Sequence, residues 1–398
     1  MRVLTLADWY LPGARGGGVP RSIANLAARL GGEAEFHVVT RDRDVGETQP
    51  YPGVRAGEWT GVGNARVLYL RGGPSAEVLR RAIGEAQAEV LYLNSVFSWA
   101  FSIRPLVFWR AGRIPRLPVV LAPRGELNDG AMRRGTAKKR AFLAAVRAAG
   151  LHRGVTWQAS TELEAEEVRR WFGRGARIRI ARDLPTLPAA DAEAPRSPKE
   201  AGVLRTVFLS RISPKKNLLG ALEILSGVTG RVVLDVFGPV EDAAYWAACE
   251  TRAASLPPNV TMRYRGDLAH EAVGAALREH DLFFLPTLGE NYGHVVQEAL
   301  LAGCPVLLSD TTPWRGLAER GVGWDLPLDD AAGFRAVIER CVAMGAEEHA
   351  AMSARARRMG MEEAEAAQAL ADNLAVFREA AGSRPPAARP RSPAATAV

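Results

Sequence analysis

The chain has 398 residues, 47% hydrophobic and 24% charged, a composition that excludes global disorder and a collagen-like protein. At roughly 100–200 residues per domain, this length predicts two or three domains. Cys249, Cys304 and Cys341 form no CxxC pair, which excludes a disulfide scaffold and a cysteine-based zinc site and favours a reducing compartment. The first residues lack a signal-peptide pattern, and no run approaches the roughly 18–20 apolar residues of a spanning helix. A cytoplasmic protein is therefore expected.

The net charge of +7 is concentrated in the first half of the chain. Residues 101–150 hold 11 basic and two acidic residues, next to the aromatic side chains of Trp99, Phe101 and Trp109. Such a segment attracts anionic partners, and the aromatic residues favour an anionic membrane surface. A solvated arginine-rich surface is the alternative. No nucleic-acid-binding motif is present, so nucleic acid is not expected as a partner.

The first half alternates apolar strands with helical segments. A predicted buried strand at residues 3–7 leads through a glycine-rich loop at 12–20 into a predicted helix at 21–30. Further strands are expected at residues 36–40, 67–70, 90–93 and 118–122. This alternation is typical of a parallel sheet that helices cover on both faces.

A break in composition divides the chain. Residues 185–204, rich in proline, alanine and charge at their start, are predicted to link a domain at 1–184 to one at 205–381. The alternation then resumes, with strands expected near residues 206–209, 232–238, 260–264, 282–285 and 305–308. Two such halves would face each other across a cleft, and ligands of open α/β sheets bind beyond the carboxyl ends of the strands. Residues 382–398 are predicted to be a disordered tail.

The densest group of polar residues is the segment 286–310, PTLGENYGHVVQEALLAGCPVLLSD. Glu290 and Glu298 are separated by seven residues, and Gly293 and His294 stand where a helix should begin. Unpaired N–H groups at a helix start suit a diphosphate, and a carboxylate one turn further suits the paired hydroxyls of a sugar. A capped helix with surface glutamates is the alternative.

The setting of these glutamates, G-E-N-Y-G-H-x-x-x-E-A-L-x-x-G-x-P-V, resembles the signature of retaining, nucleotide-sugar-dependent glycosyltransferases of the GT-B fold, in glycosyltransferase family 4. The resemblance spans roughly residues 1–380 and is strongest in the second half. It implies an α/β protein of two Rossmann-like, doubly wound domains, the first binding the acceptor and the second the nucleotide sugar.

The resemblance also assigns roles to individual residues. Arg211 and Lys216, after the strand at 206–209, match the pair that holds the donor diphosphate as charge grows on its oxygens. Glu290 is implied to orient the sugar and to stabilise developing positive charge during a front-face attack. The other implied donor contacts are Glu298, Asn291, Tyr292, Gly293, His294, Gly17, Gly18, Gly238, Asp267 and Leu268. No metal and no cofactor are expected beyond the nucleoside-diphosphate sugar itself.

In the first domain, residues 122–127 match a segment where many relatives carry a histidine directed at the sugar. This chain has Arg124 there, so no catalytic histidine can be carried over, and Arg124 becomes a candidate catalytic residue. The first-domain histidines, His37 and His152, are interpreted as packed or surface residues. The candidate acceptor-binding residues are Asn94, Glu126 and Arg21.

Together these features predict a retaining, metal-independent glycosyltransferase that moves a sugar to a glycan or lipid-linked acceptor. The segment 312–317 resembles bacterial members that build surface polysaccharides, which implies a role in that assembly at the inner face of the membrane. Two alternatives remain: a nucleotide-sugar epimerase or hydrolase on the same scaffold, and a non-catalytic sugar-nucleotide-binding partner protein.

Overall fold

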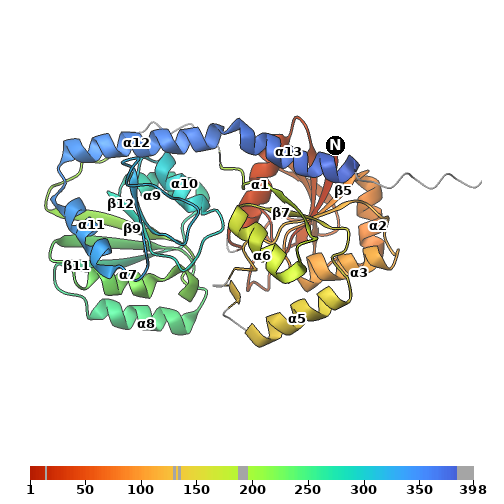
Figure 1. Ribbon diagram of the computed structural model, residues 1–398, viewed down its shortest axis with the longest axis horizontal. Coiled ribbons are helices and arrows are strands. Elements are labelled where there is room, and N and C mark those ends of the chain that lie inside the picture. The colour runs from red at the N-terminus through yellow and green to blue at the C-terminus, as the bar shows by residue number, and fades with distance from the viewer. Residues whose placement is uncertain (14–15, 129–130, 133–135, 187–195, 383–398) are drawn as a thin grey trace, which may run out of the picture.

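The computed structural model describes residues 1–13, 16–128, 131–132, 136–186 and 196–382, which form two α/β domains (Figure 1). Residues 187–195 of the predicted linker and 383–398 of the predicted tail lie outside the described residues. The predicted fold class is confirmed, because each domain is built on a largely parallel sheet with helices packed on it.

In the described part of the first domain, eight strands form one sheet in the order β3-β4-β2-β1-β5-β6-β7-β8. All neighbours pair in parallel except the edge strand β3, which runs antiparallel to β4. The sequence pattern did not predict β3, β7 or β8. The side chains of β3 and β8 are mostly exposed and form no apolar run, and β7, although buried, mixes polar and apolar residues. The strands are β1 (Arg2–Leu6), β2 (Glu35–Arg41), β3 (Trp59–Val62), β4 (Ala65–Leu70), β5 (Val90–Leu93), β6 (Val119–Leu121), β7 (Thr156–Ala159) and β8 (Arg177–Ile180).

Helices cover both faces of this sheet, since successive side chains of a strand point to opposite sides. In β1, Val3 packs towards α1 and α13, whereas Leu4 and Leu6 belong to the core beneath α2, α3, α5 and α6. The helices of this domain are α1 (Gly18–Leu30), α2 (Ala76–Glu85), a π-helical turn (Trp99–Ile103), α3 (Arg104–Arg110), α5 (Thr136–Ala148) and α6 (Glu162–Phe172).

The second domain has a wholly parallel sheet of six strands within the described residues, in the order β11-β10-β9-β12-β13-β14. Its strands are β9 (Val203–Leu209), β10 (Arg231–Phe237), β11 (Val260–Gly266), β12 (Leu282–Leu285), β13 (Val306–Ser309) and β14 (Gly323–Leu326). Its helices are α7 (Leu218–Leu225), α8 (Ala243–Ala254), α9 (His270–Arg278), α10 (His294–Leu301), α11 (Ala331–Ala343) and α12 (Ala346–Glu365).

The last helix, α13 (Ala367–Gly382), returns to the first domain, as Figure 1 shows along the upper edge of the molecule. Its Phe377 is fully buried, with its ring edge-on to Phe36 at 5.8 Å and to Tyr92 at 5.1 Å. This packing corrects the assignment of residues up to 381 to the second domain. The helix instead completes the core of the first, so the chain crosses between the domains twice.

Candidate active-site cleft

A cleft of about 570 Å³ lies between the two domains, at the carboxyl ends of strands from both sheets. Loops after β1, β5 and β6 form one wall, and loops after β9, β10 and β12 form the other. All residues assigned to the site from the sequence line this cleft, although their roles remain predictions. They are Gly17, Gly18, Arg21, Asn94, Arg124, Glu126, Arg211, Lys216, Gly238, Asp267, Leu268, Glu290, Asn291, Tyr292, Gly293, His294 and Glu298.

Lys216 and Glu290 form a largely buried ion pair between neighbouring loops of the second domain, with side chains 12% and 14% exposed. A 3₁₀ turn, Pro214–Lys216, follows β9, and the hydroxyl of Thr287, after β12, donates to the carbonyl of Lys215 at 3.0 Å. Burial alone would raise the pKa of Glu290, but Lys216 and Lys215 outweigh it and hold that pKa below its usual value. Glu290 is therefore anionic at neutral pH, with Lys216 as its counter-ion.

Arg211 lies on the second-domain side of the cleft, near the glycine-rich loop of the first domain. Its guanidinium pairs with Glu241 at 2.9 Å, and both side chains are 38% exposed. A Cβ at Gly17, where φ is +72°, would stand 3.4 Å from this guanidinium. That distance is an ordinary contact, so the positive φ, and not lack of space, is what favours glycine at position 17. The partly exposed Arg211 remains accessible from the cleft.

Helix α10 begins in the cleft at His294, after Gly293 in the left-handed conformation. The hydroxyl of Ser22, on α1 of the first domain, donates to Asp183 at 3.0 Å and lies 2.9 Å from His294 Nε2. Since the Ser22 proton is given to Asp183, its oxygen accepts the Nε2–H of His294. Burial lowers the pKa of His294 to about 4 despite attraction to Asp183, so this imidazole is neutral at pH 7.

Glu298 lies one turn further along α10, beside two residues that carry or can carry positive charge. His270 Nδ1 is 3.7 Å from its carboxylate, and Arg21 of the first domain also attracts it. Burial nevertheless raises the pKa of Glu298 to about 7. Burial likewise lowers the pKa of His270 to about 4, so the imidazole is neutral at pH 7 and only Arg21 contributes full positive charge.

Arg124 is held at the floor of the cleft by protein groups. It is ion-paired with Asp183, and its Nε donates to Asn94 Oδ1 at 3.0 Å while a terminal nitrogen donates to Tyr92 at 2.6 Å. The side chains of Arg124 and Asp183 are only 5% and 6% exposed. The guanidinium therefore fixes the ends of three strands, β5, β6 and β8, and its direct contact with a sugar remains a prediction.

Glu126 is engaged with the loop that follows β5. Its carboxylate accepts hydrogen bonds from the Ser95 hydroxyl at 2.9 Å and from the backbone N–H groups of Val96 at 2.6 Å and Phe97 at 3.3 Å. Burial raises the pKa of Glu126 to about 7 even though these donors favour the anion. The geometry gives Glu126 a part in shaping the cleft wall, and acceptor binding by it stays a prediction.

Side-chain contacts across the cleft hold the domains together. Asn291 of the second domain donates to the Ser160 hydroxyl at 2.7 Å, next to the contact between Ser22 and His294. Ser160 in turn donates to Glu164, which also accepts the backbone N–H of Gly125. The structure is thus a closed arrangement in which both walls of the cleft are tied by hydrogen bonds.

Sequence reasoning missed several residues of this cleft, among them Ser22, Asp183 and His270. Asp183 follows a strand of alternating arginines that gave no buried pattern, and its position near the expected linker concealed it. Ser22 lies four residues after Gly18, on the first turns of a predicted helix. This position, directly after the glycine-rich loop, is the sequence signal that could have identified it.

The histidines of the first domain lie outside the cleft, as the sequence predicted. His37 packs edge-on to Trp59 at 5.4 Å, and His152 belongs to an aromatic cluster on another side of the domain.

Within the described residues there is no group of three or more His, Cys, Asp or Glu side chains placed to hold a metal ion. The described helices include none long and apolar enough to cross a membrane.

Residues 191–359 match the sequence model of the family described as Glycosyl transferases group 1. The match covers 169 of the 398 residues and takes in most of the second domain. The glycosyltransferase match includes Arg211, Lys216, Glu290 and Glu298, so all four lie in the part of the chain that carries the family pattern.

Two curated relatives are phosphatidyl-myo-inositol mannosyltransferases. The protein of Mycobacterium leprae (strain TN) is 29% identical over 170 residues, which are 38% of this chain and 44% of that protein. The protein of Mycolicibacterium smegmatis (strain ATCC 700084 / mc(2)155) is 35% identical over 79 residues, 19% of this chain and 20% of that protein. The match therefore spans less than half of the length of either relative.

Solved structures resemble the chain over almost its full length. A glycosyltransferase of Rickettsia africae has a TM-score of 0.68 at 12% identity, covering 96% of this chain and 99% of its own. HepE of Anabaena, solved with UDP and glucose, has a TM-score of 0.67 at 16% identity, covering 95% and 100%. Sucrose-phosphate synthase of Thermosynechococcus elongatus has a TM-score of 0.65 at 17% identity, and the match covers 95% of this chain and 96% of that protein. At these identities the likeness establishes the fold, which is GT-B.

Proposed function

We propose that the protein is a retaining glycosyltransferase that transfers a sugar from a nucleoside-diphosphate sugar to a glycan or lipid-linked acceptor. The observation that carries this proposal is the set of Arg211, Lys216 and Glu290 around the start of α10, in a cleft closed by a second domain. Paired cations and unpaired helix N–H groups suit a diphosphate, and the adjacent carboxylate suits the sugar attached to it. HepE, with the same fold, was solved with UDP and glucose, which supports this donor class.

The donor would lie with its diphosphate between Arg211 and the first turn of α10. Positive charge fixed there before the reaction stabilises the charge that grows on the leaving phosphate oxygens, without a metal ion. Glu298 would accept the ribose hydroxyls, and the loop at Asp267 and Leu268 would face the base. Arg211 and Lys216 both follow β9 and both line the cleft, which supports this placement.

Glu290 would act on the transferred sugar. It is anionic because Lys216 and Lys215 lie beside it, and a buried anion stabilises positive charge that develops on a sugar ring. In the proposed front-face reaction, the acceptor hydroxyl attacks the anomeric carbon, the bond to the phosphate oxygen breaks, and that oxygen takes the hydroxyl proton. The new glycosidic bond then keeps the original configuration.

The acceptor would enter from the first-domain side. Arg21 and Asn94 present polar groups to the cleft there, while Arg124 and Glu126 fix the strand ends and the loop around it. Both curated relatives are named for a phosphatidyl-myo-inositol acceptor, which supports a lipid-linked acceptor. We extend the proposal to surface polysaccharide assembly by a cytoplasmic enzyme at the inner face of a bacterial membrane.

Incubation with a panel of radiolabelled sugar nucleotides tests the function. Transfer to an added glycan or lipid acceptor, with the anomeric configuration retained by NMR, is the expected result. Slow release of free sugar or a change of sugar identity would instead favour a hydrolase or an epimerase. Saturable binding with no turnover for any donor and acceptor would favour a non-catalytic partner protein.

A further inference from the structure

Helix α13 buries a polar side chain, Asn373, on the face that docks it against the first domain. Asn373 is fully buried, and its neighbours on this face are Val376, Phe377 and Ala380. Asparagine is a poor helix former, and burial of an amide is costly unless its polar atoms find partners. An apolar side chain would dock the helix without that cost, so packing alone does not account for an amide at this position.

The hydrogen bonds of Asn373 fix the direction of a chain of polar groups that leads into the sheet. Its Nδ2 donates to two backbone carbonyls, that of Arg182 at 2.7 Å and that of Ala369 at 2.8 Å. Since a carbonyl can only accept, the amide oxygen of Asn373 faces Gln158, whose Nε2 donates to it at 2.9 Å. The oxygen of Gln158 then accepts the hydroxyl proton of Tyr92 at 2.6 Å.

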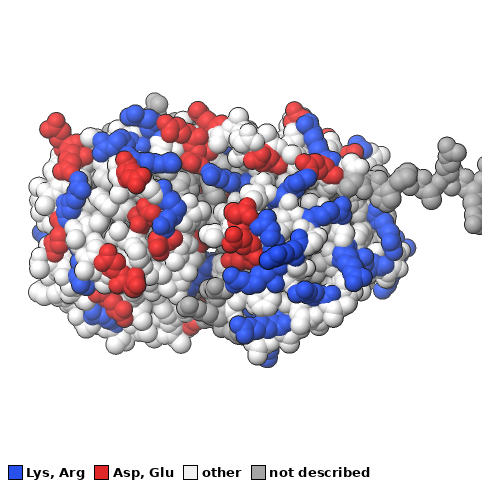
Figure 2. Space-filling model, in the orientation of Figure 1, with Lys and Arg blue, Asp and Glu red and all other residues white. Residues whose placement is uncertain are grey.

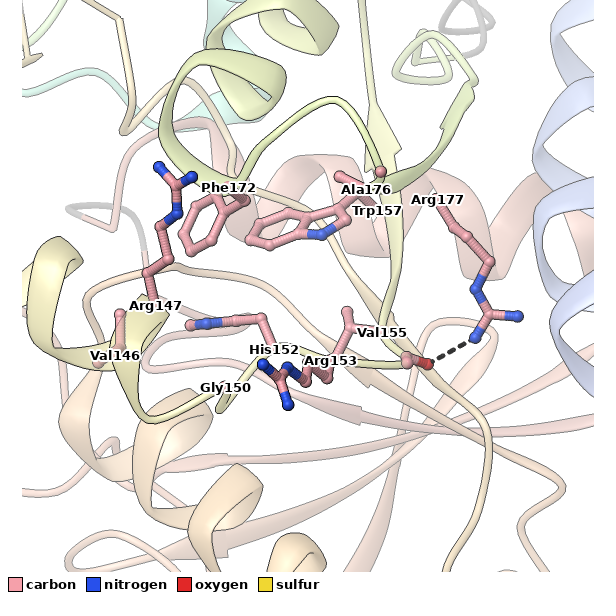
Figure 3. A pocket seen from close by; sticks show the side chains of 12 residues that line it. Val146, Arg147, Gly150, His152, Arg153, Val155, Trp157, Phe172, Ala176 and Arg177 are labelled. Carbon is pink, nitrogen blue, oxygen red and sulfur yellow. Dashed lines mark hydrogen bonds between the residues drawn. The ribbon is translucent and has the colours of Figure 1, made fainter.

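Gln158 reaches α13 because of its place in β7. Successive side chains of a strand point to opposite faces of its sheet. Trp157 therefore packs on the other face, with His152 and Phe172, in the aromatic cluster that Figure 3 shows around a cavity of about 350 Å³. Gln158 is 2% exposed. The polar chain thus lies within the core that α13 shares with the sheet.

Two branches lead from Asn373 to the ion pair at the floor of the cleft. One is the chain just described, in which the Tyr92 hydroxyl accepts from the Arg124 guanidinium at 2.6 Å. The other is the hydrogen bond to the carbonyl of Arg182, the residue directly before Asp183. Asn373 therefore holds both partners of the ion pair, one through side chains and the other through the backbone.

The ion pair transmits this arrangement to the second domain. Asp183 accepts the hydroxyl proton of Ser22 at 3.0 Å, and Ser22 lies 2.9 Å from Nε2 of His294, the first residue of α10. Each side chain on the way from Asn373 to Ser22 is less than a tenth exposed. A buried network whose polar groups all have partners is held in one geometry. The start of α10 is thus connected to α13 by a continuous line of hydrogen bonds.

Exposed ion pairs also join α13 to the first domain, but they constrain it less. Figure 2 shows acidic and basic side chains interspersed along the upper edge of this domain, where α13 runs. Arg378 pairs with Glu33 at 2.6 Å, and both side chains are more than half exposed. Such pairs are screened by water and salt and contribute little. The buried line from Asn373 is therefore the stronger constraint between α13 and the cleft.

We propose that Asn373 is a positioning residue, which acts through the ion pair of Arg124 with Asp183 and through Ser22 to place the first turn of α10 for the donor. This role rests on the proposed function, which puts the donor diphosphate at that turn. Donors that stabilise a leaving phosphate act only in the correct geometry, so a small displacement of the helix start lowers kcat/KM. A helix outside the cleft thereby takes part in the transfer.

The first test reads the geometry without turnover. In a proton–nitrogen spectrum of the whole protein, His294→Gln assigns the imidazole signal of His294 among those of the six histidines. We expect Asn373→Leu, which keeps a branched side chain but none of its polar atoms, to shift the His294 signal. The signal of His349, whose Nε2 lies 2.9 Å from the carbonyl of Asp281 in the second domain, should stay in place.

Val376→Ala is the matched control, because it truncates a buried side chain on the same face of α13 without removing a hydrogen bond. It should lower the melting temperature and leave the His294 signal in place. Tyr92→Phe removes only the branch to Arg124 and keeps the ring against Phe377. It should shift the His294 signal by less than Asn373→Leu does, and it decides the outcome if Asn373→Leu does not fold.

The second test compares donor turnover at a temperature where the variants are folded. Asn373→Leu should lower kcat/KM by about tenfold or more and Tyr92→Phe by less, whereas Val376→Ala should keep the wild-type value. The proposal is overturned if neither polar variant shifts the His294 signal, if Val376→Ala shifts it equally, or if the signal shifts and kcat/KM stays unchanged. A wild-type protein without turnover would overturn the proposed function instead, and the His294 signal would still decide whether Asn373 positions α10.

Discussion

The Asp183 carboxylate is ion-paired with the Arg124 guanidinium at the floor of the cleft, where each side chain is more than nine-tenths buried. The two residues follow different strands, β8 and β6, and lie 59 positions apart in the chain. Asp183 also accepts the hydroxyl proton of Ser22, which in turn binds His294 of the second domain. The pair thus connects the interior of the first domain to the helix that we propose holds the donor.

Arg124→Ala should destabilise the protein by about 3 kcal/mol, because breaking a buried pair leaves the remaining charge without a partner. Chemical denaturation measures this change. Arg124→Met combined with Asp183→Asn removes both charges and should recover part of the loss. An Arg124→Ala protein with unchanged stability and full activity would contradict the structural role that we give to the pair.

Arg211 and Lys216 should differ in their effect on stability although both are expected to serve the diphosphate. Each alanine variant should lower kcat/KM by about 10²-fold, the scale of one lost charge-stabilising donor. Lys216→Ala should also lower the melting temperature, since it leaves the buried Glu290 unpaired, whereas Arg211 pairs only with a partly exposed carboxylate. Glu241→Gln, which removes that carboxylate, should keep wild-type activity and serves as the control.

Gly125→Ala should weaken closure of the cleft. A Cβ at this position would stand 3.0 Å from the Cβ of Asn291 across the cleft, in a backbone conformation with φ of +72°. We expect a larger radius of gyration by small-angle scattering and a loss of kcat/KM. Gly112→Ala is the matched control, because its φ is +67° and a Cβ there would meet nothing within 4 Å. Equal effects of the two substitutions would assign the loss to backbone strain alone.

Glu298 should make stability depend on pH in a defined direction. Burial raises its pKa from 4.5 to about 7, so the native state keeps a proton that the unfolded chain has lost. That contribution is full below pH 4.5 and disappears as the pH rises through 7. The free energy of unfolding of Glu298→Gln, taken relative to that of the wild-type protein, should therefore rise by about 2 kcal/mol from pH 5 to pH 8. Chemical denaturation at both pH values measures this, with the exposed Glu250→Gln as a control that should show no such difference.

A different substitution of the same residue tests the proposed ribose contact. A contact made equally in the ground and transition states raises KM when it is lost and leaves kcat almost unchanged. Glu298→Ala should therefore act mainly on the donor KM. A collapsed kcat at constant KM would assign Glu298 to the chemical step instead.

Much of the fold could be predicted because its central strands are apolar on both faces. Segments such as residues 3–6 and 282–285 are buried throughout, and a buried parallel strand leaves that pattern in the sequence. The edge strand β8 could not be predicted in this way, since exposed arginines occupy it. The destination of α13 also could not be predicted, because an amphipathic helix shows that it packs but does not show against which domain.

The sequence could predict which residues line the site, but not which hydrogen-bond and ion-pair partners their side chains have. The glycine-rich loops and the glutamates of residues 286–310 marked the cleft, since they follow strands whose carboxyl ends converge. The partners of their side chains depend on long-range geometry. Arg124 illustrates this limit: its place in the segment suggested a substrate contact, whereas its hydrogen bonds go to Asp183, Asn94 and Tyr92.

The basic part of the first domain carries the proposal of membrane association. Of the three aromatic residues expected at this surface, Trp99 at the π-helical turn is 64% exposed, Trp109 is half-buried, and Phe101 is fully buried in the core, so the expectation for Phe101 was wrong. Val107 on α3 is 43% exposed. Lys138 and Arg140 are exposed on α5, whereas Arg133 and Arg134, two other basic residues of the segment 101–150, lie outside the described residues. Exposed apolar and basic side chains suit the headgroup region, where each basic residue contributes about 1 kcal/mol.

Vesicle co-sedimentation tests this association. Binding should require anionic lipid, fall with added salt, and weaken after Trp99→Ser or after Lys138→Gln with Arg140→Gln, because both an apolar anchor and local charge are removed. Arg231→Gln with Arg263→Gln, two exposed arginines of the second domain, is the matched control and should bind like wild type. Since the control removes the same charge elsewhere, equal weakening would show that binding follows total charge and not this surface. Equal partition to neutral and anionic vesicles would instead favour a soluble acceptor.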